Sequence, residues 1–268
     1  MERKRILITG GSSGIGFALA KKFAAEKNNI IIVARDMIRM ERAKKEISML
    51  DSSVEVDCFS ADLSKEHECN LVCNLIKKKF SSLDVLVNNA GDILCGRFED
   101  PDLAEMKRSF NLNYWGMALM TRELIPLLEK SITPHIIFMS SIAGYTGLFG
   151  YSHYAPAKFA VTGLAECLRM ELKDKKISVS VVFPPDTDTP MLGYEHEHTL
   201  RESRALSAGA KVMSVDTVAE KIYRGYLKRK FEIYCNGEGK LIRFVKSNFL
   251  SLYFGIVDGI VRKSRKGK

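Results

Sequence analysis

Six short apolar runs mark the first 190 residues, and longer segments with a helical pattern separate them. Most of the runs are continuous and rich in β-branched residues, which is typical of strands that are buried on both faces of a parallel sheet. The runs are RILIT (5–9), IIIVA (30–34), VEVDCF (54–59), LDVLVN (83–88), HIIFMS (135–140) and ISVSVVF (177–183).

The segments between the runs predict five helices. They lie at about 15–27, from the end of the second strand to about 49, from the end of the third strand to about 80, at about 102–129 and at about 154–173. Strands that alternate with helices in this way form right-handed crossovers. The pattern therefore predicts one α/β domain with a doubly wound parallel sheet, a Rossmann-type three-layer sandwich. Ligands of such sheets bind at the carboxyl ends of the strands, so the loops that follow the strands carry the candidate site.

The first of these loops is TGGSSGIG (9–16), which follows the first strand and opens the first helix. Its spacing is TGxxxGxG rather than GxGxxG. A glycine-rich turn into a helix N-terminus offers backbone N–H groups and a positive dipole to a pyrophosphate, and glycine lets the backbone approach the ligand. The alternative is a tight turn that binds nothing. The predicted cofactor contacts are Gly10, Ser12, Ser13, Gly14, Ile15 and Gly16.

The second strand ends in Ala34 and Arg35, and Arg39 follows one helical turn later. An acidic residue at this strand end would bind the ribose hydroxyls of NAD, whereas two guanidinium groups suit the 2′-phosphate of NADP. Asp36 lies beyond the strand end, where it could cap the next helix. We therefore expect NADPH as the cofactor, with a solvated helix face as the alternative for the two arginines.

Composition adds one asymmetry. The chain has 268 residues and a net charge of +9, and residues 221–268 hold 13 lysines and arginines against 3 acidic residues. The basic excess thus lies in the last fifth of the chain, beside apolar residues, which favours an anionic membrane surface over nucleic acid. The six cysteines lack zinc-site spacing and the N-terminus lacks a signal-peptide pattern, so we expect no metal and a reducing cytosolic setting.

YSHYAPAK (151–158) places Tyr154 and Lys158 four residues apart, on one face of a predicted helix. The spacing alone is not diagnostic, since Tyr226 and Lys230 share it. Proline is tolerated only in the first helical turn, so Pro156 predicts a helix start near residue 154.

Taken together, these motifs resemble the short-chain dehydrogenases/reductases over about residues 5–190. The resemblance rests on TGxxxGxG, on NNAG (88–91), on the last Asn of NLN (111–113), on SS (140–141) and on Tyr154-x-x-x-Lys158. It implies a catalytic tetrad of Asn113, Ser141, Tyr154 and Lys158, and a cofactor site that also includes Asp62, Leu63, Asn89, Ala90 and Gly91. Asp62 would accept from the adenine amino group, with helix capping as its alternative role.

The resemblance also implies the role of each catalytic residue. Tyr154 donates a proton to the ketone oxygen while hydride reaches the carbon. Lys158 favours the phenolate, lowering the tyrosine pKa from about 10, and holds the nicotinamide ribose. Ser141 orients the carbonyl and Asn113 supports a proton-relay water. Ser140 should point away from the site, and Tyr151 and His153 are given no chemistry.

The loop FPPDTDTPML (183–192) departs from the Pro-Gly that most family members carry. It resembles the subgroup that reduces 3-oxosphinganine with NADPH in sphingolipid synthesis. Pro184 would stiffen the loop, and Thr187 and Thr189 would reach the nicotinamide carboxamide. The alternatives are a reductase of another lipophilic ketone, steroid or 3-ketoacyl, and an NADP-binding sensor or scaffold without turnover.

We expect residues 1–240 to form the catalytic domain, with a substrate lid at about 190–215, and residues 241–268 to form a membrane-interacting segment. The apolar run from Phe249 to Val261, broken by Asp258, is shorter than the ~20 residues that span a bilayer. An interfacial helix is predicted, with a helix packed on the domain or at an oligomer interface as the alternative. The predicted protein is a homo-oligomer, cytoplasmic and peripherally membrane-associated, on the cytosolic face of the endoplasmic reticulum in a eukaryote.

Overall fold

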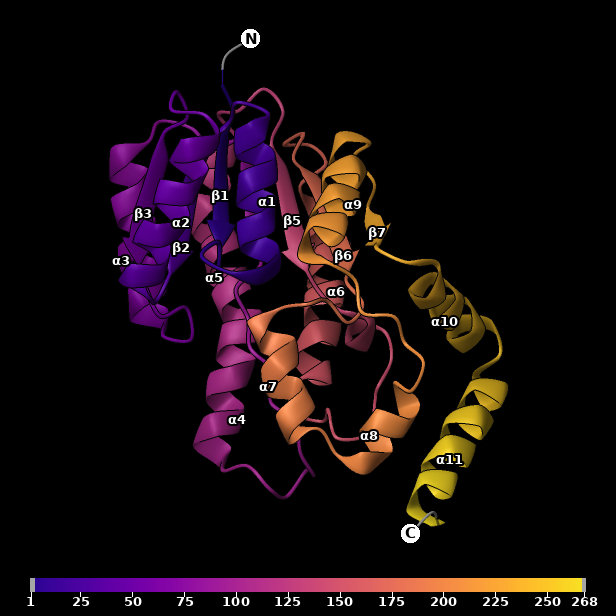
Figure 1. The fold of residues 1–268 in the computed structure, drawn as a ribbon. Coiled ribbons are helices and arrows are strands. Elements are labelled where there is room, and N and C mark those ends of the chain that lie inside the picture. The colour runs from indigo at the N-terminus through magenta and orange to yellow at the C-terminus, as the bar shows by residue number, and fades with distance from the viewer. Residues whose placement is uncertain (1–2, 267–268) are drawn as a thin grey trace.

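The computed structural model describes residues 3–266 and confirms the predicted parallel sheet (Figure 1). Seven strands lie in the order β3-β2-β1-β4-β5-β6-β7, and every pairing is parallel. The strands are β1 Arg5–Thr9, β2 Asn29–Ala34, β3 Val56–Ser60, β4 Val85–Asn88, β5 His135–Met139, β6 Ser178–Phe183 and β7 Glu232–Tyr234. β7 was not predicted, because three residues are too few to show a strand pattern.

Helices cover both faces of the sheet, as the continuous apolar strands require. Along β1, Ile6 and Ile8 pack in one core with residues of α1, α2 and α9, while Leu7 packs in the other with α3, α5 and α6. These helices are α1 Gly14–Ala25, α2 Met37–Leu50, α3 Glu66–Lys79, α5 Gly116–Leu128, α6 Ala155–Glu171 and α9 Val215–Leu227.

The helix predicted at about 102–129 is divided into three parts. α4 Leu103–Phe110 continues into a π-helical turn, η1 Asn111–Trp115, and then into α5. A π turn inside a helix is frequent at functional sites, because the inserted residue changes where one side chain points. Here the turn contains Asn113, whose side chain is fully buried.

The start of α6 agrees with the proline argument. α6 begins at Ala155, with Pro156 in its first turn and Tyr154 at the N-cap position. The missing proline N–H costs nothing there, because the first turn has no intrahelical partner for it. Tyr154 consequently lies at the mouth of the helix, next to the loop that follows β5.

The lid and the tail are helical. α7 Pro190–His198 and α8 Arg201–Leu206 lie in the segment for which a lid is predicted, while α10 Gly237–Asn248 and α11 Leu250–Lys266 form the tail. α10 begins after the cap residue Asn236, and α11 covers the apolar run for which a helix is predicted. α11 lies along α8 on the outside of the molecule (Figure 1).

Within residues 3–266, no single helix is long and apolar enough to cross a membrane. α10 and α11 reach the required length and composition only as a pair, and a bend of 118° separates them.

Candidate active site

The glycine loop leaves no room for side chains. Gly10 and Gly14 have φ angles of +67° and +53°, which L-residues rarely adopt. A Cβ at Gly16 would lie 2.5 Å from the Gly10 carbonyl oxygen and 2.4 Å from the Asn89 amide nitrogen. Ser13 is the N-cap residue of α1, and its carbonyl accepts from the Phe17 N–H at 3.1 Å. The loop therefore presents backbone at the helix N-terminus, as predicted. The predicted Ser12 and Ile15 are partly buried in and beside it.

Asn89 ties the loop after β4 to this turn. Its side-chain amide donates to the carbonyls of Thr9 and Gly10, at 2.9 and 3.3 Å. The Thr9 hydroxyl in turn accepts from the backbone N–H groups of Asn89 and Ala90. Asn89 and Ala90 thus lie at the glycine loop, as predicted, and their hydrogen bonds hold this loop in place.

The two arginines that would select NADP are both exposed at the carboxyl end of β2. The Asp36 carboxylate caps α2 by accepting from the Arg39 N–H at 3.0 Å, and its other oxygen lies 3.2 Å from Arg39 Nε. Asp36 is therefore committed to helix capping, in agreement with the sequence. Arg39 is held by this ion pair with Asp36, whereas Arg35 carries no ion pair within residues 3–266. Both guanidinium groups are exposed, and a phosphate at the strand end would compete with Asp36 for Arg39.

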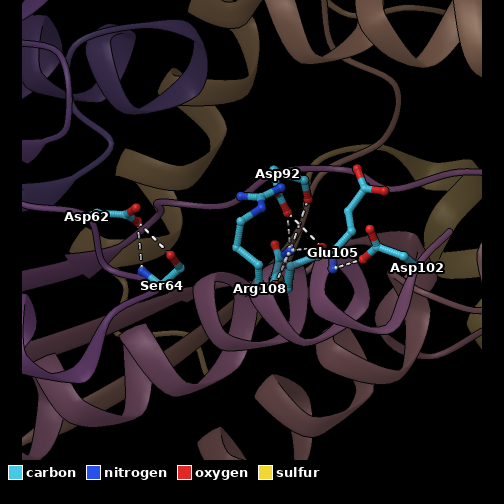
Figure 2. Close-up of polar contacts among 8 residues, drawn as sticks. Asp62, Ser64, Asp92, Asp102, Glu105 and Arg108 are labelled. Atoms are coloured by element: carbon cyan, nitrogen blue, oxygen red, sulfur yellow. Dashed lines mark hydrogen bonds and ion pairs between the residues drawn. The ribbon is translucent and has the colours of Figure 1, made fainter.

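Asp62 forms a local turn rather than the helix cap proposed as its alternative role. Its carboxylate accepts from the Ser64 N–H and hydroxyl, at 3.1 and 2.7 Å (Figure 2). α3 instead begins after Lys65, so Asp62 lies too far upstream to cap it. Burial is the largest influence on the Asp62 pKa and raises it, but the Ser64 hydrogen bonds outweigh burial and hold the pKa below its usual value. Leu63, the next predicted residue, is buried.

Three members of the predicted tetrad converge at the carboxyl end of β5. Ser141 caps a short helical turn, η2 Ile142–Gly144, and its side chain is close enough to Tyr154 to act against the rise of the tyrosine pKa. Lys158 Nζ lies 5.5 Å from the centroid of the Tyr154 ring and donates to the Met139 carbonyl at 3.1 Å. Ser140 points into the protein, towards the Lys158 carbonyl, as predicted.

Burial, rather than the lysine charge, dominates the pKa values of this pair. It raises the pKa of Tyr154 well above its usual value, and the Ser141 hydrogen bond only partly opposes the rise. The same burial lowers the pKa of Lys158 to about 8. The expected lowering of the tyrosine pKa is therefore wrong for this structure, because desolvation disfavours the charged form of both groups. The hydroxyl is held in its proton-carrying form.

Asn113 is held by Asp92, a residue that the sequence motifs do not identify. The Asn113 amide donates to the Asp92 carboxylate at 2.8 Å and to the Asp92 carbonyl at 3.0 Å. The carboxylate also accepts from Ser109 at 2.8 Å and from Arg108 at 2.7 Å (Figure 2). The only sequence signal for this role of Asp92 is its position directly after NNAG (88–91).

These hydrogen bonds engage the amide nitrogen of Asn113 and thereby orient its amide oxygen, Oδ1. Its Oδ1 is buried and has no hydrogen-bond partner within residues 3–266. A Cβ at Gly91 would lie 2.6 Å from this oxygen and 3.5 Å from Lys158 Nζ, so Gly91 separates the two polar groups. A buried acceptor is costly when it is unpaired. An acceptor beside Lys158 suits the predicted proton-relay water.

The loops after β1, β4, β5 and β6, together with the lid, line a cavity of about 340 Å³. Its lining residues include Tyr154, Lys158 and Ser141 of the candidate tetrad and apolar residues of the lid. Pro184, Thr187 and Thr189 line it, as predicted. The Thr187 hydroxyl donates to the Pro185 carbonyl at 2.7 Å, so its oxygen can only accept from a ligand, and Thr189 caps α7.

Of the two residues that were given no chemistry, only His153 is structural. It is buried, stacks on Phe98 with ring centroids 5.6 Å apart, and its Nε2 lies 3.0 Å from the Arg97 carbonyl. Tyr151 instead lines the cavity, and its ring meets that of Tyr154 edge-on with centroids 6.4 Å apart. Sequence position alone does not show which way the loop before α6 turns, so this place in the cavity wall was not predicted.

Comparison with known proteins agrees with this geometry. The sequence pattern described as "short chain dehydrogenase" matches residues 4–199, which is most of the chain. The chain belongs to the short-chain dehydrogenase family. This short-chain dehydrogenase is thus an oxidoreductase that interconverts CH–OH and C=O groups with NAD(P)H.

Two curated relatives have similar names. The chain is 37% identical to "3-ketodihydrosphingosine reductase" of Bos taurus, over 88% of this chain and 72% of that protein. It is 36% identical to "3-dehydrosphinganine reductase" of Danio rerio, over 84% of this chain and 69% of that protein. A solved short-chain dehydrogenase from Sphingobium yanoikuyae in complex with NADPH has a TM-score of 0.79 and 26% identity, over 99% of this chain and 98% of that one.

The cofactor implied by the family fits the residues present. The glycine loop offers unobstructed backbone at the start of α1, and Lys158 lines the cavity beside Gly91, next to which the Asn113 oxygen also lies. When bound, NAD(P)H supplies the hydride. The chain's own part is to place the carbonyl against Ser141 and Tyr154 and to hold the tyrosine proton until it is transferred.

Proposed function

We propose that this short-chain dehydrogenase reduces a lipid ketone with NADPH, and that the ketone is 3-oxosphinganine, which becomes sphinganine. The observation that carries the proposal is the cavity, which joins the Tyr154 hydroxyl to an apolar wall. That wall is made by Ile93, Leu148, Met191, Leu192, Leu206 and Ile242. An apolar cavity next to a proton donor suits a ketone on a hydrocarbon chain.

The residues around Tyr154 support the chemical step. Its hydroxyl is buried and protonated, so it can give a proton to the ketone oxygen. The Ser141 hydroxyl lies at the end of β5, where it can donate to the same oxygen and orient it. Lys158 and Asn113 lie on either side of Gly91, where a relayed proton can restore the tyrosine.

The relatives' names and the loop PPDTDTP support the substrate. Both curated relatives described above are named for reduction of this amino ketone. Arg35 and Arg39 support NADPH over NADH, since both are exposed beside the glycine loop. A non-catalytic sensor is disfavoured by the buried Asn113 acceptor and the buried lysine, which are costly unless they serve the reaction.

A reductase assay tests this proposal. NADPH oxidation is followed at matched concentrations of 3-oxosphinganine, a steroid ketone and a 3-ketoacyl thioester, with Tyr154→Phe as the control. We expect the highest kcat/KM for 3-oxosphinganine and loss of turnover in the variant. Preference for either other ketone contradicts the substrate, and an active Tyr154→Phe contradicts the mechanism.

The tail supports a second part of the proposal, attachment to an anionic membrane surface such as the cytosolic face of the endoplasmic reticulum. Apolar side chains of α10 and α11 remain more than half exposed, among them Phe244, Leu252 and Ile256. Three basic residues lie in the last turn of α11. An exposed apolar face with basic residues at one end is typical of an interfacial helix.

Attachment is better tested by substitution than by removal of residues 241–268, because the tail also contacts the residues that follow Ser141 of the candidate site in the chain. Lys246 donates to the Tyr145 carbonyl at 2.6 Å, and Tyr253 bonds to Thr146. We expect Leu252→Glu with Ile256→Glu to abolish sedimentation with phosphatidylserine-containing vesicles. The matched control, Leu71→Glu with Leu75→Glu, has the same spacing and similar exposure on α3. Equal sedimentation of the two variants would contradict attachment through the tail. Homo-oligomer formation stays a prediction.

A further inference from the structure

One wall of the cavity carries an acid that the proposed reaction does not use. Glu195 lies on α7, and the same face of this helix lines the cavity with Met191 and Leu192. Side chains four residues apart on a helix share a face, so the helix that supplies the apolar wall also places a carboxylate in it.

The contacts of Glu195 hold it in place without neutralising it. Its Oε1 accepts a short hydrogen bond from the Tyr151 hydroxyl. Within residues 3–266 it has no ion pair with a lysine or arginine, although Lys158 and Lys211 line the same cavity. His196, exposed on the same helix, is a basic group close enough to act on the Glu195 carboxylate.

A second acid strengthens the negative character of this wall. Asp186, from the loop after β6, also lines the cavity and lies close enough to Glu195 to raise its pKa. Burial is the main reason that the pKa values of both carboxyl groups are raised. Two partly buried acids without a lysine or arginine partner form a site that a cation would stabilise.

The position of this wall relative to the reacting carbonyl is set by Tyr151. The Tyr151 ring contacts Tyr154 edge-on, with centroids 6.4 Å apart, while its hydroxyl bonds to Glu195. One tyrosine ring therefore separates the proton donor from the carboxylate. A positively charged group that reaches Glu195 must therefore be attached to the substrate close to the ketone. The hydrocarbon chain of the substrate then contacts the apolar residues of the lid.

We propose that Glu195, held by Tyr151, selects substrates that carry a protonated amino group next to the ketone. The inference rests on the proposed function and deepens it, because it names the residue that would recognise the amino group of 3-oxosphinganine. A ketone without the amine would leave the partly buried Glu195 carboxylate without a counter-charge, so its kcat/KM should fall by more than the loss of the amine's other contacts alone would cause. Asp186 adds negative charge to the same wall.

The test compares two substrates that differ in one charge. 3-Oxosphinganine carries an ammonium group, and its N-acetyl derivative is neutral at the same position. The measured quantity is the ratio of their kcat/KM values. We expect the wild-type protein to favour the amine, and Glu195→Gln to lower that ratio about 10- to 100-fold, the range of hydrogen bonds to charged groups. The loss should appear in KM for the amine.

Matched variants guard against unrelated causes. Glu197→Gln removes the same charge from the same helix, but Glu197 is exposed and does not line the cavity. It should keep the wild-type ratio. Tyr151→Phe removes the hydroxyl that holds Glu195 and should lower the ratio in the same direction by a smaller factor, which keeps the test informative if Glu195→Gln folds poorly.

The outcomes separate this inference from the proposed function. If the wild type reduces both substrates equally well, or if the Glu195 and Tyr151 variants keep the wild-type ratio, Glu195 is not the selecting residue and the lipid-ketone reductase still stands. If the wild type reduces neither ketone with NADPH, the proposed function fails and the inference fails with it.

Discussion

The cofactor side and the substrate side of this molecule are built differently. At the carboxyl ends of β1 and β4, a Cβ added to Gly10, Gly16 or Gly91 would lie within 3.0 Å of another atom. In the lid, nothing lies within 4 Å of such a Cβ at Gly193 or Gly209. The cofactor side is closed by backbone packed against backbone and against the Asn89 and Asn113 side chains, whereas the lid is closed by replaceable side chains on short helices.

The difference follows from what each region must recognise. The pyrophosphate is the same in NAD(H) and NADP(H), and backbone N–H groups at a helix N-terminus can bind it without charged side chains. The substrate differs from one reductase to another, and this part of the cavity is lined by side chains such as Glu195 and Leu192, which can change without disturbing the sheet. Tyr154 lies where the two regions meet.

The largest effect is expected at Tyr154, where the cofactor side and the substrate side meet. Tyr154→Phe removes the proton donor and should lower kcat by about 100- to 10,000-fold, the usual contribution of general acid catalysis. NADPH binding should persist, because the glycine loop is untouched. Turnover is measured by NADPH oxidation and binding by fluorescence titration. A small loss of kcat would show that the cofactor side alone suffices for the reaction.

Cofactor choice tests whether charge matters at the edge of the cofactor side. Arg35→Ala with Arg39→Ala should weaken NADPH binding about 10- to 100-fold, because charge-assisted hydrogen bonds to the phosphate are lost. NADH binding should change little. Lys45→Ala, an exposed position further along α2, is the control. Unchanged NADPH binding would assign the arginines to a solvated helix face, and parallel weakening of both cofactors would show that they do not select the 2′-phosphate.

A pair of glycine substitutions tests the contrast in packing directly. Gly16→Ala should destabilise the protein by about 1–3 kcal/mol through overpacking and should weaken NADPH binding. Gly193→Ala, inside α7 with open space around it, should stabilise the protein by about 0.5–1 kcal/mol. Urea unfolding measures both. Equal effects at the two positions would remove the distinction between the regions.

A smaller effect concerns the buried lysine. Because burial lowers the pKa of Lys158 to about 8, the folded protein loses this proton before the unfolded chain does, whose lysine has a pKa of 10.5. Between these two pKa values the unfolded chain binds more protons, so Lys158 makes stability rise with pH.

The rise can be isolated by substitution. Between pH values of about 7.5 and 9.5, the free energy of unfolding of the wild type should increase by about 2 kcal/mol relative to Lys158→Met. The exposed Lys173→Met should behave as the wild type does. Urea unfolding at the two pH values is the measurement, and parallel curves for the wild type and Lys158→Met would mean that the ammonium is not desolvated.

Local patterns predicted the cofactor side well. Apolar runs revealed six strands, and Pro156 placed the start of α6, because both depend on backbone preferences that act within a few residues. They could not reveal the π turn at Asn113, the support from Asp92, or β7. Each of these depends on a partner that is distant in the chain, as when Asp92 accepts from Asn113 at a separation of 21 residues.

The sequence by itself determined the sheet, the glycine loop and the residues of the tetrad, since strand periodicity and motif spacing are properties of adjacent residues. Only the tertiary structure decided that Tyr151 faces the cavity, that burial governs the pKa values of Tyr154 and Lys158, and that Glu195 stands beside them. Desolvation and cavity shape arise where segments far apart in the chain enclose a common space, and no local pattern carries that information.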